Sequence, residues 1–277
     1  MQFNVASLLL RASELLSAVS DSPRLDAELM LANVMQVSRS YLYAYPEKNI
    51  NEQVQTQFEK MLQRRLQGEP VAYIVGYQEF WSLLFKVTPH TLIPRPETEG
   101  IIEFVLQYVT SEKAIIADLG TGSGAIAIAL AYERPAWQIH ATDQSEEALL
   151  VAKENANTYH LPIHFHLGHW CEVLPPIQFD AIVSNPPYIA EHDFAFSEKT
   201  LAFEPKSALV SNEMGFSALK MIIETAYPHL QRGGWLVLEH GFDQAALVQE
   251  MMKKRGYSSV STYRDYAGIE RITVGKI

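Results

Sequence analysis

The stretch FDAIVSNPPY, residues 179–188, decides the fold. Residues 179–184 are short, apolar and rich in residues that favour β-structure, so they predict a buried strand of a parallel sheet. The two prolines end this strand, because proline has no N–H for the ladder and fixes its own φ. We therefore expect Asn185 at the carboxyl end of a central strand, where open α/β sheets bind ligands, with Tyr188 beside it. The alternative interpretation is an ordinary turn that ends a strand.

The same alternation of strand and helix runs from residue 114 almost to the C-terminus. Repeated βα units predict a doubly wound parallel sheet with right-handed crossovers. Residues 260–263 and 271–274 look like two strands with no helix between them, so we expect an antiparallel hairpin at the edge. The other expected strands cover residues 114–119, 138–142, 163–167, 179–184 and 235–239, and the expected helices cover 99–109, 124–132, 145–157, 215–230 and 243–255.

The N-terminal part has a different pattern. Apolar residues recur at helical spacing, so residues 1–72 are expected to form a small helical domain. Residues 73–94 carry β-branched and aromatic residues, which predicts a β-hairpin linker with strands near 73–77 and 80–87. Residues 95–277 are then expected to form the larger α/β domain.

Composition and charge restrict the class of protein. The chain has 277 residues, 48% of them apolar, and a net charge of −10, which argues against a protein whose main task is to grip nucleic-acid phosphates. Cys171 is the single cysteine, so an internal disulfide is impossible. No stretch reaches the roughly 18–20 apolar residues that span a bilayer, and no basic-then-apolar leader is recognisable. We expect a cytoplasmic protein that contacts neither membrane nor nucleic acid.

Histidine spacing gives little support for a metal site. His160 and His164 have H-x-x-x-H spacing, but Pro162 opposes the helix that would put both on one face. His164 and His166 alternate along an expected strand. We therefore expect no metal.

A glycine-rich loop, DLGTGSG at residues 118–124, follows one expected strand and precedes a helix. Its glycines allow a tight turn with room for a ligand, and the helix start supplies free N–H donors. The loop also fits a relaxed dinucleotide fingerprint, and it could serve only helix–sheet packing. Asp118 argues against pyrophosphate and suits S-adenosylmethionine, which carries an ammonium and a sulfonium. Asp143 can accept hydrogen bonds from both ribose hydroxyls, and this would serve S-adenosylmethionine and a dinucleotide such as NAD equally well.

These motifs together resemble a known family. The patterns at 118–124 and at 185–188 (Asn-Pro-Pro-Tyr) look like those of class I S-adenosylmethionine-dependent methyltransferases that modify a planar nitrogen, in DNA adenine or in protein glutamine. LIPRPETE at 92–99, FEPKSAL at 203–209 and LEHG at 238–241 are similar to those of the release factor glutamine methyltransferases. Ribosomal-protein glutamine methyltransferases are the nearest relatives and usually lack the Pro-Glu-Thr-Glu form. The resemblance implies a seven-stranded mixed sheet in a cofactor-binding domain at residues 95–277 and a substrate-recognition role for the helical domain at residues 1–72. It also implies peptide chain release factors as the protein substrate.

The resemblance also implies roles at matching positions. The loop would line the methionine part of the cofactor, Asp143 its ribose and Trp170 its adenine, although His169 stands where the family usually has Asp. The residues expected to bind S-adenosylmethionine are Asp118, Gly120, Thr121, Gly122, Ser123, Gly124, Asp143, Trp170 and Asn185. Those expected to bind the glutamine substrate are Asn185, Pro186, Pro187, Tyr188, Glu97 and Glu204, with Asn185, Pro186 and Tyr188 catalytic.

The main task of the residues at this site is to orient the substrate amide nitrogen toward the methyl group. A carboxamide nitrogen is a poor nucleophile because its lone pair is delocalised, so we expect the Asn185 oxygen and the Pro186 carbonyl to accept its two hydrogens and aim the lone pair at the methyl. A dedicated base is not expected. Glu97, Glu99 and Glu204 are expected to frame the release-factor loop; alternatively, Arg95 and Glu97 form an ordinary salt bridge.

Three rival functions differ in what they explain. A DNA adenine methyltransferase must flip its base and grip phosphates, which the acidic charge opposes. An NAD-dependent oxidoreductase would use the glycine loop but leaves residues 185–188 unexplained. A non-catalytic cofactor-binding module conflicts with the intact motif at those residues.

Overall fold

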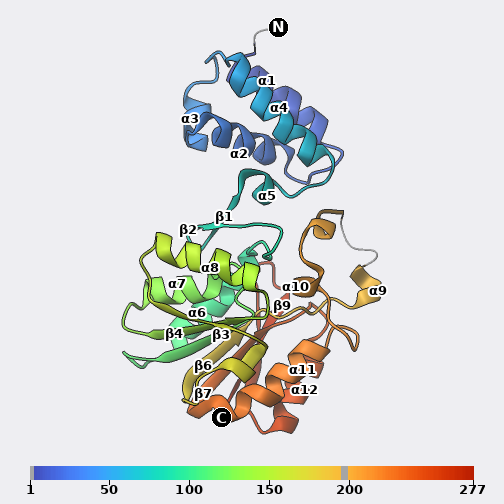
Figure 1. Ribbon diagram of the computed structural model, residues 1–277. Coiled ribbons are helices and arrows are strands. Elements are labelled where there is room, and N and C mark those ends of the chain that lie inside the picture. Colours follow the sequence, from blue (N-terminus) through green and yellow to red (C-terminus); the bar gives the residue numbers. More distant parts are fainter. Residues whose placement is uncertain (1–2, 195–198) are drawn as a thin grey trace. The chain divides into compact units, whose positions relative to one another are not determined.

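The computed structural model describes residues 3–194 and 199–277 (Figure 1). The chain divides into two compact units. The first, the helical unit, runs to Tyr77 and includes the short segment that ends at Phe203; the second, the sheet unit, begins at Gln78 and continues from Glu204 to the C-terminus. Among the described residues, no helix is both long and apolar enough to cross a bilayer.

The helical unit contains five helices with a core of their own. Asn4 and Asn51 cap two of them, each accepting from a backbone N–H three residues on, and Pro23 occupies the first turn of another. A buried ion pair between Arg65 and Asp26, at 2.7 Å, connects two of the helices. The helical domain expected in this part of the chain is present, and two short helices, α3 and α5, add to its three longer ones. The helices are α1 (Val5–Leu16), α2 (Pro23–Met35), α3 (Arg39–Ala44), α4 (Glu52–Leu66) and α5 (Val71–Val75).

Helix α5 corrects the expected hairpin. Residues 73–75 were expected in a strand but are helical, because Pro70 starts a turn there and Gly76, at φ +87°, ends it. Ile74 lies in the core of the helical unit, so packing overrides β-branched composition. The hairpin itself is β1 (Tyr77–Phe80) and β2 (Leu83–Lys86). Three of its apolar side chains belong to the core of the sheet unit: Phe80, Leu83 and Phe85.

The sheet has seven strands in the order β5-β4-β3-β6-β7-β9-β8. The first five pair in parallel, whereas β9 pairs antiparallel with both of its neighbours. The expected doubly wound mixed sheet with an antiparallel edge hairpin is therefore confirmed. The strands are β3 (Ile115–Leu119), β4 (Gln138–Asp143), β5 (Ile163–Leu167), β6 (Phe179–Ser184), β7 (Leu230–Glu239), β8 (Ser258–Arg264) and β9 (Glu270–Lys276).

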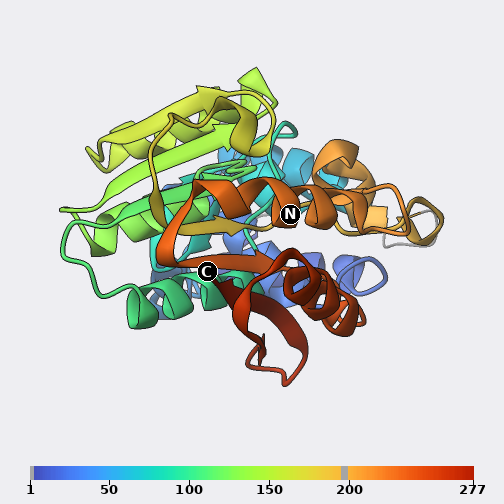
Figure 2. The ribbon, with the colours of Figure 1, turned by 90° about the horizontal axis from the view of Figure 1, so that it is seen from below.

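Helices cover both faces of this sheet (Figure 2). Alternate strand residues face opposite cores: Ile116 and Val183 pack with α6, α7 and α8, whereas Ala117 and Ile182 pack with α11 and α12. The helix expected at 215–230 ends earlier, and β7 begins before 235. The helices are α6 (Glu99–Tyr108), α7 (Ala125–Glu133), α8 (Glu146–Thr158), α9 (Glu191–Phe194), α10 (Lys206–Leu209), α11 (Ser217–Ala226) and α12 (Ala245–Arg255), with 3₁₀ turns η1 (Pro96–Thr98), η2 (Trp170–Val173), η3 (Lys199–Phe203) and η4 (Tyr227–His229).

Strand register brings the expected site residues to one edge. Leu119 at the end of β3 lies opposite Thr142 of β4 and Ser184 of β6, and Ser184 lies opposite Leu238 of β7. The Ser184 hydroxyl donates to the Leu119 carbonyl at 2.7 Å and fastens the two central strands. The chain order reverses between β3 and β6, which makes this edge the topological switch point where such sheets bind ligands.

Candidate active site

The glycine loop between β3 and α7 has two separate packing roles. The N–H groups of Gly120 and Thr121 both donate to the Thr142 carbonyl at 2.9 Å, which ties the loop to the end of β4. A Cβ on Gly120, at φ +70°, would lie 2.9 Å from the Trp170 ring. A Cβ on Gly124 would instead meet side chains of α7 and α8, at 2.9 Å and 3.2 Å. Gly120 thus admits the tryptophan, and Gly124 admits close helix packing.

Asp118 lies beneath this loop and does not line the cavity. Its Oδ2 accepts from the Thr121 hydroxyl at 2.6 Å and from the Ala127 N–H at 3.2 Å. Its Oδ1 has no hydrogen-bond partner within the part of the chain that the structure describes. Burial raises the pKa of Asp118 to about 7, and the two hydrogen bonds oppose this rise. A buried acceptor without a donor indicates a site that favours a nearby cation.

Asp143 connects the loop to the second strand. Its Oδ2 accepts from the Gly122 N–H and its Oδ1 from the Ser145 N–H, both at 2.9 Å. Burial raises its pKa, while these backbone donors lower it. Unlike Asp118, Asp143 lines the cavity, and a carboxylate has about four acceptor positions, so Asp143 keeps acceptor capacity for a ligand.

Trp170 forms one wall. It begins η2 with φ +45°, and its ring covers Gly120. The His169 ring lies 5.3 Å from the Trp170 ring, edge to face, and both residues line the cavity. The next glycine back, Gly168, donates its N–H to the Asp143 carbonyl at 2.9 Å, which holds this turn against the end of β4.

Asn185 lies on the opposite wall, directly after β6. Its Nδ2 donates to Thr98 Oγ1 at 3.0 Å. Pro187 also lines the cavity, whereas Pro186 is buried and does not. Tyr188 is half-buried outside the cavity lining, and its hydroxyl donates to Glu239 Oε1 at 3.2 Å.

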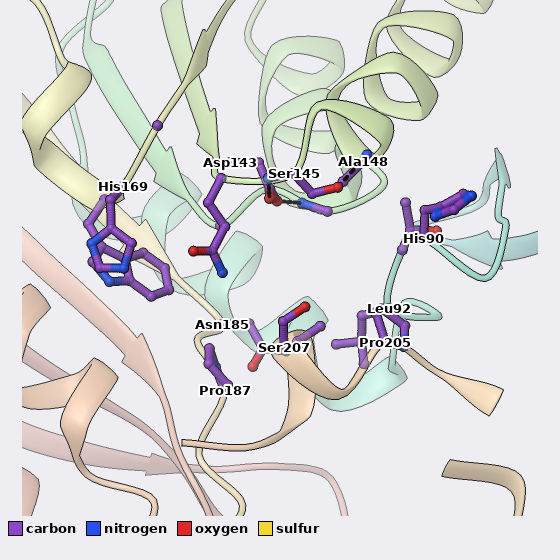
Figure 3. A pocket seen from close by; sticks show the side chains of 17 residues that line it. His90, Leu92, Asp143, Ser145, Ala148, His169, Asn185, Pro187, Pro205 and Ser207 are labelled. Atoms are coloured by element: carbon purple, nitrogen blue, oxygen red, sulfur yellow. Dashed lines mark hydrogen bonds between the residues drawn. The ribbon is translucent and has the colours of Figure 1, made fainter. Parts of the chain in front are cut away.

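The space within the cavity amounts to about 660 Å³, a figure that includes the part open to solvent. Figure 3 shows Asp143 and Ser145 facing Asn185 and Pro187 across it, with His169 at one end and His90 at the other. All lining residues belong to the sheet unit. They are His90, Thr91, Leu92, Gly120, Gly122, Asp143, Gln144, Ser145, Ala148, Gly168, His169, Trp170, Asn185, Pro187, Pro205, Ser207 and Ala208.

Sequence reasoning paired Arg95 with Glu97 as one alternative, and this pairing is wrong. Arg95 forms its ion pair with Glu204, whose Oε2 also accepts from the Ile93 N–H at 3.0 Å. Glu204 is buried, and through these two contacts its oxygens hold residues 93–95 in place. Glu97 is exposed, and Glu99 accepts from the Trp81 N–H at 2.7 Å.

Sequence reasoning also missed three buried partners. Thr98 and Glu239, which hold Asn185 and Tyr188, stand in stretches that the family resemblance singled out, and this was the only signal. His140 Nδ1 lies 2.9 Å from His166 Nε2, and the His140 ring stacks on His164. Burial lowers the pKa of His140 to about 4. Within residues 3–194 and 199–277, no three His, Cys, Asp or Glu side chains are grouped to hold a metal.

Comparisons with known proteins agree with the fold. Residues 102–213 match the methyltransferase small domain family. The structure of the N-terminal domain of human METTL16 in complex with SAH superposes with a TM-score of 0.53 over 70% of this chain and 76% of that one, at 18% identity. The seven-stranded sheet, the glycine loop and these two matches define the class I methyltransferase fold.

Sequence matches over nearly the whole chain show its family. Residues 7–76 match the PrmC N-terminal domain. The release factor glutamine methyltransferase of Coxiella burnetii is 48% identical over 95% of this chain and 95% of its own length. That of Aliivibrio fischeri is 44% identical over 100% of this chain and 98% of its own length. The chain belongs to the release factor glutamine methyltransferase family.

Proposed function

We propose that this protein transfers the methyl group of S-adenosylmethionine to the N5 amide nitrogen of the glutamine in the Gly-Gly-Gln motif of peptide chain release factors. The names of its relatives support this substrate. The observation that carries the proposal is that Asn185 and the glycine loop face one cavity from opposite walls. A translation factor as substrate agrees with the cytoplasm as the place of reaction.

The residues present fit this cofactor. The backbone at Gly122 is open, since a Cβ there would meet no heavy atom within 4 Å. Asp143 has acceptor capacity for ribose hydroxyls, and Trp170 offers a ring face for adenine. The unpartnered oxygen of Asp118 favours positive charge above the loop. The SAH bound to the METTL16 domain supports a cofactor of this type in this fold.

The cofactor supplies a methyl group already activated on a sulfonium. The protein holds the amide nitrogen in line with it, and such orientation can contribute about 7–11 kcal/mol. The Asn185 NH₂ group donates to Thr98 Oγ1, which leaves Asn185 Oδ1 free to accept one substrate N–H. Pro186 and Tyr188 lie behind the cavity lining, next to Asn185 and Pro187, and the proposal requires the Pro186 carbonyl to accept the other N–H and Tyr188 to lie against the amide plane. Both acceptors favour the positive charge that develops on nitrogen. The methylated amide is acidic enough to lose its proton to water.

The two acidic residues expected to bind the substrate, Glu204 and Glu97, act in different ways. Glu204 positions residues 93–95 from within, because both of its oxygens are already bonded. Glu97 is exposed and contacts the release-factor loop.

The helical unit recognises the release factor away from its glutamine. Its own core and its exposed apolar side chains support this role. Single serine substitutions of these side chains should include some that raise KM for an intact release factor while leaving kcat/KM for a short Gly-Gly-Gln peptide unchanged. If none separates the two substrates, this role is wrong. The residues to substitute are Leu10, Leu15, Leu25, Tyr43 and Tyr45.

The direct test of the activity is incubation with a purified release factor and methyl-labelled S-adenosylmethionine, followed by mass mapping of the product. We expect one added methyl group on the glutamine of Gly-Gly-Gln. Label on ribosomal protein or DNA but not on the release factor would contradict the proposed substrate.

A further inference from the structure

A chain of hydrogen bonds connects Asn185 to a carboxylate inside the sheet unit. Asn185 Nδ2 donates to Thr98 Oγ1 at 3.0 Å, and the Thr98 hydroxyl donates to Glu239 Oε2 at 2.7 Å. The second oxygen, Oε1, accepts from the Tyr188 hydroxyl at 3.2 Å. Thr98 is 5% exposed and Glu239 is 1% exposed, and neither lines the cavity. They can therefore act on the site only through Asn185 and Tyr188.

When Glu239 is ionised, the hydrogen bonds between Asn185, Thr98 and Glu239 can be donated in one direction only. A carboxylate can only accept, so the single Thr98 proton is directed to Glu239, and Thr98 Oγ1 is left as an acceptor. Asn185 must then turn its NH₂ group to Thr98 and its oxygen away. A reversed amide would set the Asn185 and Thr98 oxygens against each other with no proton between them.

We propose that Glu239, acting through Thr98, is a positioning residue that keeps the Asn185 oxygen turned toward the substrate amide. The proposal rests on the proposed function, because it concerns the acceptor that Asn185 offers to the glutamine nitrogen. A reversed Asn185 presents N–H donors to the N–H₂ group of the substrate, so the substrate amide loses its acceptor. The same carboxylate holds the Tyr188 hydroxyl and fixes both ends of the Asn-Pro-Pro-Tyr motif.

Regular elements carry the two residues that position Asn185. Glu239 is the last residue of β7, and its neighbour Leu238 pairs with Ser184, the residue before Asn185. Thr98 ends η1 directly before α6. The sheet therefore places Glu239 beside the motif, and the helix start places Thr98 between them.

Protonation of Glu239 would remove this fixed direction of hydrogen-bond donation. Burial raises the pKa of Glu239 to about 7. Hydrogen bonds from Thr98 and Tyr188 and the charge of Arg271 oppose this rise, and the charge of Glu97 adds to it. Arg271 is itself paired with Asp265. A protonated Glu239 can donate to Thr98, which frees the Thr98 hydroxyl to donate to the Asn185 oxygen and permits both orientations. At saturating substrates, kcat should therefore fall as the pH decreases through about 7.

The experiment compares four single variants with the wild type, Thr98→Val, Thr98→Ser, Glu239→Gln and Thr273→Val, together with the double variant that combines Thr98→Val and Glu239→Gln. Thr273 is the matched control, a fully buried threonine whose hydroxyl bonds His240 and has no link to Asn185. We measure kcat on a purified release factor at saturating S-adenosylmethionine, Kd for the cofactor by calorimetry, and Tm.

Thr98→Val and Glu239→Gln should each lower kcat by about tenfold or more, as losses of supporting partners do elsewhere, with Kd for the cofactor unchanged. Thr98→Ser keeps the hydroxyl and should keep kcat. Thr98→Val combined with Glu239→Gln should lose no more than the worse single variant, because both interrupt one chain. The fall in kcat below pH 7 should be absent in Glu239→Gln. Thr273→Val should lower Tm but not kcat.

Equal kcat values for Thr98→Val and Thr273→Val, in a preparation whose wild type methylates the release factor, would overturn this inference and leave the proposed function intact. A wild-type enzyme without activity on any release factor would instead overturn the proposed function. Glu239→Gln that does not fold leaves Thr98→Val and Thr98→Ser to decide.

Discussion

Replacing Asp143 by Asn tests the cofactor site most sharply, because the two side chains have the same shape. Both carboxylate oxygens accept a backbone N–H, from Gly122 and from Ser145. Asparagine has a single oxygen, so one of these donors must face an NH₂ group. That mismatch should lower the free energy of unfolding by about 1–3 kcal/mol, the usual cost of an unsatisfied donor.

The effect on binding adds the loss of a charged acceptor for the ribose hydroxyls. Hydrogen bonds to a charged group contribute roughly 1.5–3 kcal/mol, so Kd for S-adenosylmethionine should increase by about tenfold to about 150-fold. Isothermal titration calorimetry measures Kd, and urea unfolding measures stability. Glu146→Gln is the matched control, since it removes the same charge from an exposed residue nearby. An unchanged Kd for Asp143→Asn, or an equal increase for Glu146→Gln, would refute the reasoning.

Two further substitutions test the loop and its buried acid. Gly120→Ala should weaken cofactor binding as well as stability, because a Cβ at φ +70° costs about 1–2 kcal/mol and meets Trp170. The control Gly268→Ala, at φ +80° with open space around it, should lose stability only. Equal Kd values for both variants in calorimetry would contradict this prediction. Burial raises the pKa of Asp118 from 3.8 to about 7, so the folded chain binds a proton that the unfolded chain releases, and stability falls as the pH rises from about 4 to about 7. In urea unfolding without cofactor, Asp118→Asn should therefore gain on the wild type between pH 5 and pH 8, and a difference that does not change with pH would show that Asp118 is not protonated there.

Local signals predicted much of the sheet. The apolar run of β6 and the prolines that end it are contiguous, so the position of Asn185 could be derived from the chain alone. The glycine loop was equally local. Residues 73–75 misled, because β-branched side chains suit a strand, while packing in the helical unit and the flanking Pro70 and Gly76 select a helix.

Contacts between distant residues could not be predicted. Thr98 and Glu239 are 141 positions apart, and Ile93 and Glu204 are 111 apart. Nothing in the residues next to Arg95 shows that it pairs with Glu204 rather than Glu97. Burial is what perturbs the pKa of Asp118 and Glu239, and burial is a property of the folded sheet.

The central claim is that Asn185 places the glutamine nitrogen, and that its expected contact with the cofactor contributes little to cofactor affinity. Single-turnover methylation of a purified release factor by Asn185→Ala, together with Kd for S-adenosylmethionine, tests it directly. The account predicts a rate about 100-fold to 1,000-fold lower, as when one preorganised hydrogen bond is removed from a transition state, with Kd nearly unchanged. Equal losses in rate and in cofactor affinity would contradict it.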